Sequence, residues 1–156
     1  MLRYLWIAVM VIALDQASKV AALRFLTRHA EVELLPFLNL TLSFNTGAAF
    51  GFLNDASGWQ NFFFVAVALI ATAIIFFWLR RLQPTERLIA VALCLILGGA
   101  IGNLLDRLFY GYVVDFIDVV FGSWHFWTFN IADSAISIGA VLLVIDTLGI
   151  GKSRPA

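Results

Sequence analysis

The sequence predicts a mainly α-helical membrane protein: a four-transmembrane-helix bundle with a small β-strand-bearing loop region outside the bilayer. The first observation is composition, since the 156 residues are 62% hydrophobic and 13% charged, whereas soluble domains are about 45–50% apolar and about 25% charged. The second is the presence of four apolar segments of about the 20 residues that span a bilayer. The third is that two more polar segments between them carry strand patterns.

These segments form one predicted integral membrane domain, 1–156. The spans are expected at about 4–26, 61–79, 86–108 and 130–148, and the outer loops at about 27–60 and 109–129.

Composition also limits the chemistry. Ten basic and ten acidic residues cancel, so no basic face for nucleic acid is indicated. Cys94 is the only cysteine and lies in an apolar segment, which excludes disulfides and thiolate metal clusters. His29 and His125 show no ligand spacing, and no His-Glu-x-x-His sequence of a zinc protease is present. We therefore expect no metal and no cofactor.

The first span begins like a signal peptide, with one positive charge before an apolar run. Asp15, Gln16 and Lys19 interrupt it where a small-residue cleavage site would be expected, so we predict a mature transmembrane helix. Asp15 and Lys19 are four residues apart and can pair on one face. Two interpretations stay open: the pair only holds helices together, or it supports a functional site.

The first outer loop contains a predicted half-buried strand. From Leu38 to Asn45 apolar and polar residues alternate strictly. The small residues from Asn45 to Gly51 that follow indicate either a tight turn or a backbone surface that receives an extended peptide. The next span, 61–79, is uniformly apolar and rich in phenylalanine, and we expect it to be lipid-facing scaffold.

The third span is predicted to pack closely against another helix. Gly98 and Gly102 have the small-xxx-small spacing of membrane helix interfaces. Near its end three polar residues share one face: Asn103, Asp106 and Arg107. Two interpretations stay open. Asp106 and Arg107 form a plain interfacial charge pair, or Asn103 and Arg107 have an organising role, which is favoured because Gly99 extends their face into the packed interior.

The second outer loop carries a predicted hairpin. Two β-rich runs, Tyr112 to Phe121 and Trp124 to Phe129, flank a Gly-Ser turn. The fourth span then has a polar stripe on an apolar helix, which must face protein or water: Asn130, Asp133 or Ser134, and Ser137. Basic residues are concentrated at the other ends of the spans, so the positive-inside rule places both termini in the cytoplasm and both loops outside.

Asp115 and Asp133 are the candidate catalytic residues. Each lies in apolar surroundings, where a carboxylate is disfavoured by several kcal/mol and marks a functional hypothesis. We propose that each is the other's partner. Two carboxyl groups held close cannot both ionise cheaply, so one supplies an acid and the other a base, enough for peptide hydrolysis without a metal.

The alternatives to this aspartyl hydrolase are a serine hydrolase and a transporter. A serine mechanism is improbable because neither His29 nor His125 has an evident orienting acid. Polar residues on several spans could instead line an ion or proton path. The spans show no repeat symmetry and their polar residues gather towards one face, which favours the hydrolase over a transporter.

Five segments in order resemble the lipoprotein signal peptidases, the type II signal peptidases of bacteria, over essentially the whole chain. They are Asp15-Gln16-Ala17-Ser18-Lys19, Asn45-Thr46-Gly47-Ala48-Ala49-Phe50-Gly51, Gly98 to Arg107, Val113-Val114-Asp115-Phe116 and Phe129-Asn130-Ile131-Ala132-Asp133-Ser134. Each segment alone is a weak signal, whereas five in order on four spans are highly specific.

The resemblance implies an aspartyl endopeptidase that cleaves a prolipoprotein before a cysteine carrying diacylglyceryl. It makes Asp115 and Asp133 the catalytic pair and assigns substrate-binding or supporting positions to a further set: Asn45, Gly47, Asn103, Arg107, Asn130, Ala132, Asp15 and Lys19. It also implies a bacterial inner membrane location, an active site at the periplasmic face, acyl chains left in membrane lipid, inhibition by globomycin and a mobile flap before the catalytic pair.

Overall fold

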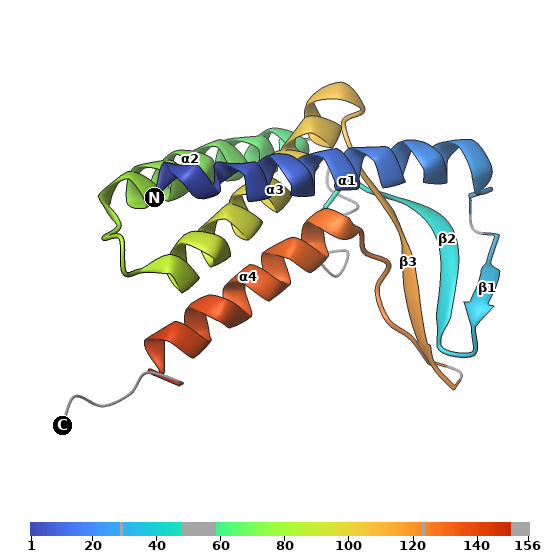
Figure 1. Cartoon of the computed structure of the whole chain (residues 1–156). Helices are drawn as coiled ribbons and strands as arrows, with labels where there is room; N and C mark the ends of the chain where they lie inside the picture. Colours follow the sequence, from blue (N-terminus) through green and yellow to red (C-terminus); the bar gives the residue numbers. More distant parts are fainter. Residues whose placement is uncertain (29, 48–58, 123, 151–156) are drawn as a thin grey trace.

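The fold was examined in a computed structural model that describes residues 1–28, 30–47, 59–122 and 124–150. Four long helices and a small sheet make up this part of the chain (Figure 1). The helices are α1 (Leu5–Phe25), preceded by the short η1 (Leu2–Tyr4), α2 (Trp59–Arg81), α3 (Arg87–Phe109) and α4 (Ile131–Thr147). All four lie within about two residues of the predicted spans.

The sheet lies at one end of the helix bundle, beneath the C-terminal half of α1 in Figure 1. Its strands are β1 (Val32–Leu35), β2 (Leu38–Asn45), β3 (Val113–Phe121) and β4 (Trp124–His125), in the order β1-β2-β3-β4 with every neighbour antiparallel. The predicted strand in the first loop is confirmed. The second run of the predicted hairpin is shorter than expected, because β4 ends at His125 and Phe129 makes only an isolated bridge to Ile117.

α3 is the central element of the bundle and contacts α1, α2 and α4. Two glycines on it make this close approach feasible. A Cβ atom added at Gly98 would lie 2.9 Å from the Ala8 carbonyl oxygen of α1, and one added at Gly99 would contact the carbonyl oxygen of Ala132 on α4. Gly99 therefore sets the distance between α3 and the first turn of α4.

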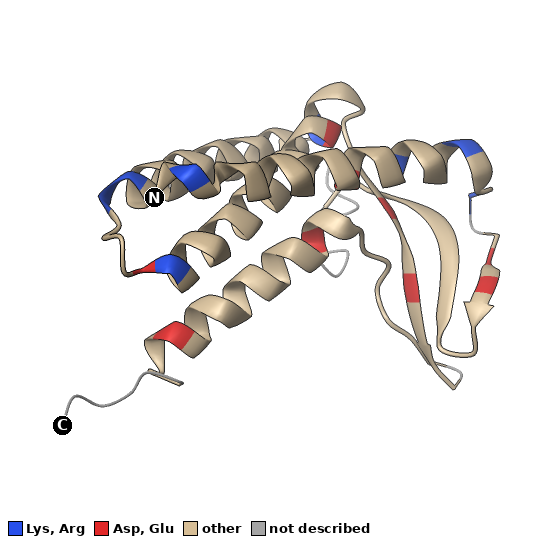
Figure 2. Cartoon of the chain, in the orientation of Figure 1, with Lys and Arg blue, Asp and Glu red and all other residues tan. Residues whose placement is uncertain are grey.

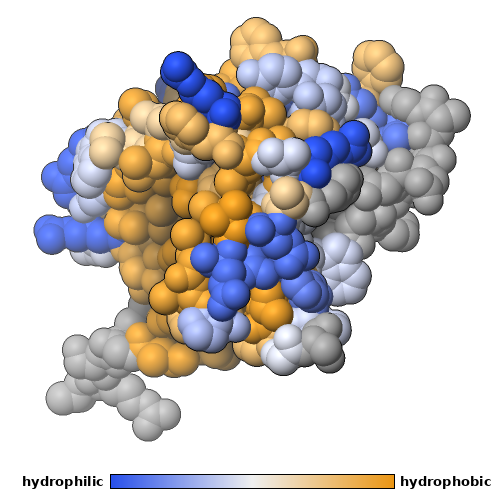
Figure 3. All heavy atoms as spheres, turned by 90° about the vertical axis from the view of Figure 1, so that its right-hand side faces the viewer, coloured by the Kyte–Doolittle hydropathy of each residue, from blue (hydrophilic) through white to orange (hydrophobic). Residues whose placement is uncertain are grey.

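Three helical segments in the described part of the chain are long and apolar enough to cross a membrane: Leu2–Phe25, Trp59–Arg81 and Arg87–Phe109. α4 has 17 residues, about 25 Å at 1.5 Å per residue. The outer face of α2 is strongly apolar, with Phe62 77% exposed. Figure 3 shows a broad hydrophobic surface beside a hydrophilic patch. Such a surface suits contact with hydrocarbon rather than water.

Both signs of charge occur at each end of the molecule, including basic residues at the C-terminal end of α1 and acidic residues near both ends of α4 (Figure 2). Basic residues gather where α2 ends and α3 begins, and acidic residues lie on β1 and β3. A second core, formed by Ala22 of α1 with Leu42, Val114 and Phe116, fixes the sheet against the bundle. Since Asp115 lies between two of these buried residues, the same packing sets its position.

Candidate functional site

Asp115 and Asp133 come from different elements and meet around one side chain, that of Asn130. Asp115 lies on β3 and Asp133 in the first turn of α4. The Asn130 Nδ2 atom donates to Asp115 Oδ1 at 2.6 Å, and the Asn130 backbone N–H donates to Asp133 Oδ2 at 3.3 Å. The two acids are therefore linked by hydrogen bonds to a shared asparagine, Asn130.

The first turn of α4 fixes Asp133 by a reciprocal cap. Asn130 is the N-cap, and its Oδ1 atom accepts from the Asp133 backbone N–H at 2.9 Å. The Asp133 carboxylate in turn accepts from the Asn130 backbone, which completes the capping box. A carboxylate at this position also lies near the positive end of the helix dipole. The site therefore favours Asp133 as the ionised member of the pair.

Asp115 is only 2% exposed and belongs to a strand, with no helix end to stabilise its charge. Asn45 Nδ2 donates to its second oxygen at 3.1 Å, from the end of the neighbouring strand β2. Burial, together with the nearby charge of Asp133, raises the pKa of Asp115 to about 7. Asp115 is therefore suited to hold a proton near neutral pH.

Asn103 connects the acids to a buried ion cluster. Its Nδ2 atom donates to Asp133 Oδ1 at 2.8 Å, and its Oδ1 atom accepts from Lys19 Nζ at 2.8 Å and from Asn130 Nδ2 at 3.2 Å. Lys19 also pairs with Asp15 at 2.8 Å, as the four-residue spacing predicted. The Asn103 side chain therefore links Lys19 to Asp133 by hydrogen bonds.

Asp15 supports α4 directly. Its Oδ1 atom accepts from the Ala132 backbone N–H at 2.9 Å, one residue before Asp133. Of the two interpretations left open for Asp15 and Lys19, the contacts favour support of the site. Asp15, Lys19 and Asp106 are 0–2% exposed and bonded to one another, so they do not line an open ion path.

For Asp106, the sequence left open a plain charge pair with Arg107. The structure pairs it with Lys19 at 2.9 Å rather than with Arg107. Its Oδ2 atom also accepts from the Val114 backbone N–H at 3.0 Å, next to Asp115. Adjacent residues on a helix point in different directions, so Asp106 faces α1 and β3 whereas Arg107 faces elsewhere. Asp106 is a positioning residue that was not in the predicted site.

Arg107 holds the turn after β2. Its Nη2 atom donates to the Gly47 carbonyl oxygen at 2.9 Å, and Gly47 N–H donates to Asn45 Oδ1 at 2.9 Å. The guanidinium carbon lies 5.1 Å from the Phe64 ring centroid of α2. The part of the predicted turn from Ala48 to Gly51 lies outside the described residues. Arg107 therefore joins α2, α3 and the turn that carries Asn45.

A pocket of about 540 Å³ opens onto Asp133. Its polar wall includes Asn45, Asn103 and Arg107, and its apolar wall includes Val113, Phe126, Phe129, Ile136 and Ile138. Asp115 is not among the described residues that line this pocket, but its hydrogen-bond partner Asn45 is. A pocket with one polar and one apolar side fits an extended peptide whose side chains are apolar.

One sequence inference about histidine was wrong. His125 does have an orienting acid, because its Nδ1 atom lies 2.7 Å from Asp118 Oδ2. This hydrogen bond raises the pKa of His125 above 6.5. The register of the predicted hairpin could have found the pair, since Val120 opposes His125 and Asp118 is then the diagonal neighbour on the same face.

Comparisons with known proteins show the family of this chain. The family model described as Signal peptidase (SPase) II matches residues 7–149. The lipoprotein signal peptidase of Coxiella burnetii is 48% identical over 152 residues, covering 97% of this chain and 93% of that protein. The lipoprotein signal peptidase of Burkholderia cenocepacia is 53% identical over 145 residues, covering 93% of this chain and 87% of that protein.

The fold is also that of solved membrane enzymes. A bacterial membrane enzyme determined by the in meso method at 2.3 Å resolution matches with a TM-score of 0.86 and 33% identity, covering 99% of this chain and 93% of that one. A second, determined at 1.9 Å, gives 0.84 and 32%, covering 97% and 94%. The chain belongs to the signal peptidase II family.

Proposed function

We propose that this chain is an aspartyl endopeptidase that removes the signal peptide from diacylglyceryl-modified prolipoproteins, with Asp115 and Asp133 as its catalytic pair. Membership of the signal peptidase II family supports signal peptide removal, and the lipoprotein signal peptidase relatives support a prolipoprotein substrate. One observation supports the aspartyl mechanism: two carboxyl groups in different electrostatic surroundings share hydrogen bonds with Asn130, and one of them, Asp133, lines a half-apolar pocket.

The two acids have separate tasks in this mechanism. Asp133, at the helix N-terminus, takes a proton from a water molecule, whose oxygen forms a bond to the scissile carbonyl carbon. Asp115 holds its proton near neutral pH and donates it to the carbonyl oxygen as charge develops there. When the tetrahedral intermediate collapses, the C–N bond breaks and the proton held by Asp133 passes to the leaving amine. The C=O bond re-forms at the same time, and the proton on its oxygen returns to Asp115.

The other site residues position the substrate and the acids. Arg107 and Asn45 lie on the polar wall of the pocket, within reach of an extended backbone, and Gly47 is held beside them. The Ala132 backbone N–H is bound to the Asp15–Lys19 pair, which anchors the first turn of α4. We assign cleavage to the peptide bond just before the lipid-modified cysteine, with the acyl chains remaining in membrane lipid.

The proposed orientation places this chemistry at the periplasmic face of a bacterial inner membrane. We propose that α4 is a fourth span, giving four spans with both termini in the cytoplasm. The basic residues where α2 meets α3 support this orientation under the positive-inside rule (Figure 2). The site then lies at the level of the sheet, at the opposite end of the bundle.

The test is a gel-shift cleavage assay on a diacylglyceryl-modified prolipoprotein. Asp115→Asn and Asp133→Asn should each abolish cleavage while the protein still inserts and folds, and Asp146→Asn on the last turn of α4 is the matched control. Full activity in either of the first two variants would refute the catalytic pair. Globomycin should block wild-type processing in competition with substrate.

A further inference from the structure

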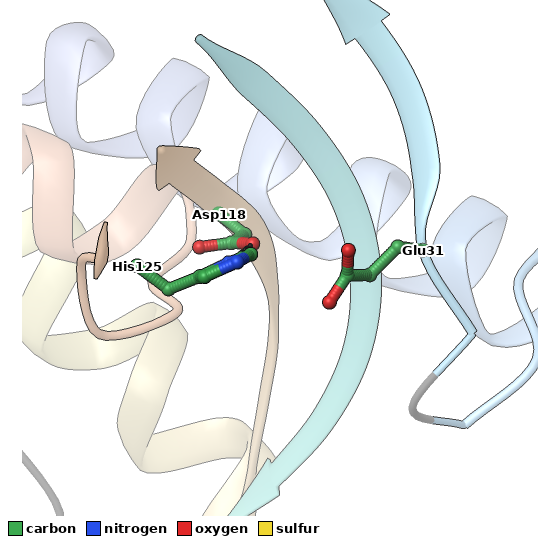
Figure 4. A group of neighbouring side chains, drawn as sticks. All are labelled: Glu31, Asp118 and His125. Carbon is green, nitrogen blue, oxygen red and sulfur yellow. Dashed lines mark hydrogen bonds and ion pairs between the residues drawn. The ribbon is translucent and has the colours of Figure 1, made fainter. Parts of the chain in front are cut away.

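A second pocket, of about 490 Å³, lies over the sheet away from the proposed catalytic pair. Three of its lining residues could ligate a metal: Glu31, Asp118 and His125. They come from the segment before β1, from β3 and from β4, so three separate pieces of chain converge there (Figure 4). No lysine or arginine is among the described residues that line this pocket.

Asp118 is the best-defined of the three. Its side chain is only 3% exposed, and its Oδ2 atom is occupied by His125 Nδ1 at 2.7 Å. Its other oxygen, Oδ1, is buried and has no hydrogen-bond partner among the described residues. A buried carboxylate oxygen without a donor loses its hydration with no replacement. The pocket therefore contains an acceptor that a cation would satisfy.

Glu31 is placed towards the other two residues. Asn39, which lies opposite Asp118 in the β2–β3 register, donates to Glu31 Oε2 at 3.4 Å. One ligand atom from each of Glu31, Asp118 and His125 lies within 4.8 Å of the other two. Ligands 2.0–2.2 Å from a tetrahedral ion are about 3.4 Å apart. Because Glu31 and His125 are exposed, rotation of their side chains can bring the three ligand atoms to the separation that a bound ion requires.

A simple ion pair between His125 and Asp118 accounts for only part of this geometry. It places one imidazolium beside the two carboxylates of Asp118 and Glu31, and it leaves Asp118 Oδ1 without a hydrogen-bond partner among the described residues. A divalent cation with neutral imidazole balances both carboxylates at once. Imidazole with carboxylates is a ligand set that suits zinc and other transition metals.

We propose that Glu31, Asp118 and His125 form a binding site for a divalent transition-metal ion, with Zn²⁺ as the representative ion. Each supplies one ligand atom, through a carboxylate oxygen or the His125 Nδ1 atom, and water completes the coordination. The ion is not part of the proposed peptidase chemistry. It ties β4 to β3 and to the segment before β1.

The site has a direct connection to the peptidase pocket. His125 is followed by Phe126 and Trp127, and both of these line the pocket that opens onto Asp133. An ion bound at His125 holds the start of this segment to the sheet. Metal occupancy therefore reduces the freedom of the aromatic wall over Asp133 without contacting either catalytic acid.

The experiment uses full-length protein without a histidine tag, purified in detergent and freed of metal with a chelator. Zn²⁺ binding is measured by isothermal titration calorimetry, with the thermal midpoint recorded as a second readout. We expect one Zn²⁺ per chain and a rise in the midpoint with Zn²⁺ concentration. His125→Ala, at an exposed side chain, and the near-isosteric Asp118→Asn should each weaken binding at least tenfold.

Two control variants separate this site from others. His29→Ala removes the other histidine of the chain and should leave the affinity unchanged. Asp115→Asn should lose peptide cleavage and keep Zn²⁺ binding, which distinguishes failure of the metal site from failure of the proposed function. The proposal is overturned if the wild type binds no Zn²⁺, or if His125→Ala binds it as tightly as the wild type. Loss of binding in Asp115→Asn would also overturn it, because the metal would then lie at the catalytic pair.

Discussion

Replacing Asn130 with aspartate should separate the structural role of this residue from its electrostatic role. The wild-type side chain accepts the Asp133 backbone N–H at 2.9 Å and donates to Asp115 at 2.6 Å. Aspartate is about as good an N-cap as asparagine, so Asn130→Asp keeps the first interaction. It loses the second and places a third carboxyl group between the two proposed catalytic acids.

The size of the effect follows from the lost donor. A hydrogen bond to an uncharged group contributes about 0.5–1.5 kcal/mol, and about 1.4 kcal/mol corresponds to tenfold in rate. Because Asp115 is the protonated acid, loss of the Asn130 amide alone should lower kcat/KM by about 2- to 12-fold. Repulsion among three carboxyl groups adds to this loss near neutral pH and shifts the remaining activity towards acid pH.

The assay is prolipoprotein cleavage measured as kcat/KM from pH 5 to 8, with the thermal midpoint of each variant recorded in detergent. Asn130→Ala is the matched variant, since it loses the cap as well and should lower the free energy of unfolding by about a further 0.5–2 kcal/mol. Wild-type kcat/KM in Asn130→Asp at pH 7 would refute the role of this amide in the site.

Three further predictions concern packing, the buried charges and pH. Gly99→Ala should push α4 from α3 through contact with Ala132 and lower both the thermal midpoint and kcat/KM. Gly111→Asn, at a φ of 80° with open space, should change neither. Equal thermal midpoints in these two variants would contradict the packing argument. Lys19→Met leaves two buried carboxylates unpaired and should reduce stability by about 3–5 kcal/mol, measured as the shift of the denaturation midpoint. Because the pKa of Asp115 is raised to about 7, the contribution of this residue to the free energy of unfolding should fall as the pH rises from about 4 to about 7. The rate constant kcat/KM should fall above about pH 7, where Asp115 loses its proton. A kcat/KM that instead rises through pH 8 would exclude Asp115 as the proton donor.

The sequence predicted the helices and the pair of acids because both depend on strong local signals. Long apolar segments give helix positions directly, and an acid in an apolar segment is costly enough to stand out. The pairing of Asp115 with Asp133 was an inference from this cost. The part played by Asn130 was visible only in the structure, since one amide serves as helix cap and as donor to Asp115.

Contacts between distant elements were the least predictable. A charge pair of Asp106 with its neighbour Arg107 was one of two interpretations that the sequence left open, but the helix directs Asp106 to Lys19 on α1. The convergence of Glu31 with Asp118 and His125 depends on the β2–β3 register, which contains an irregularity between Leu40 and Ser43. Alternation of residue types along one strand does not reveal such an irregularity.

The buried cluster around Lys19 also determines when the protein can finish folding in the cell. α1 is synthesised first, and at that stage Asp15 and Lys19 have only each other within the first span. The Ala132 backbone that Asp15 binds lies 117 residues later, roughly 6 to 23 s of synthesis at 5–20 residues per second. Each of these charges costs about 2.5–3.5 kcal/mol at the centre of an inserted helix. Docking of α1 is therefore a late event that follows insertion of α3 and α4, and the proposed catalytic pair is assembled only at the end of biogenesis.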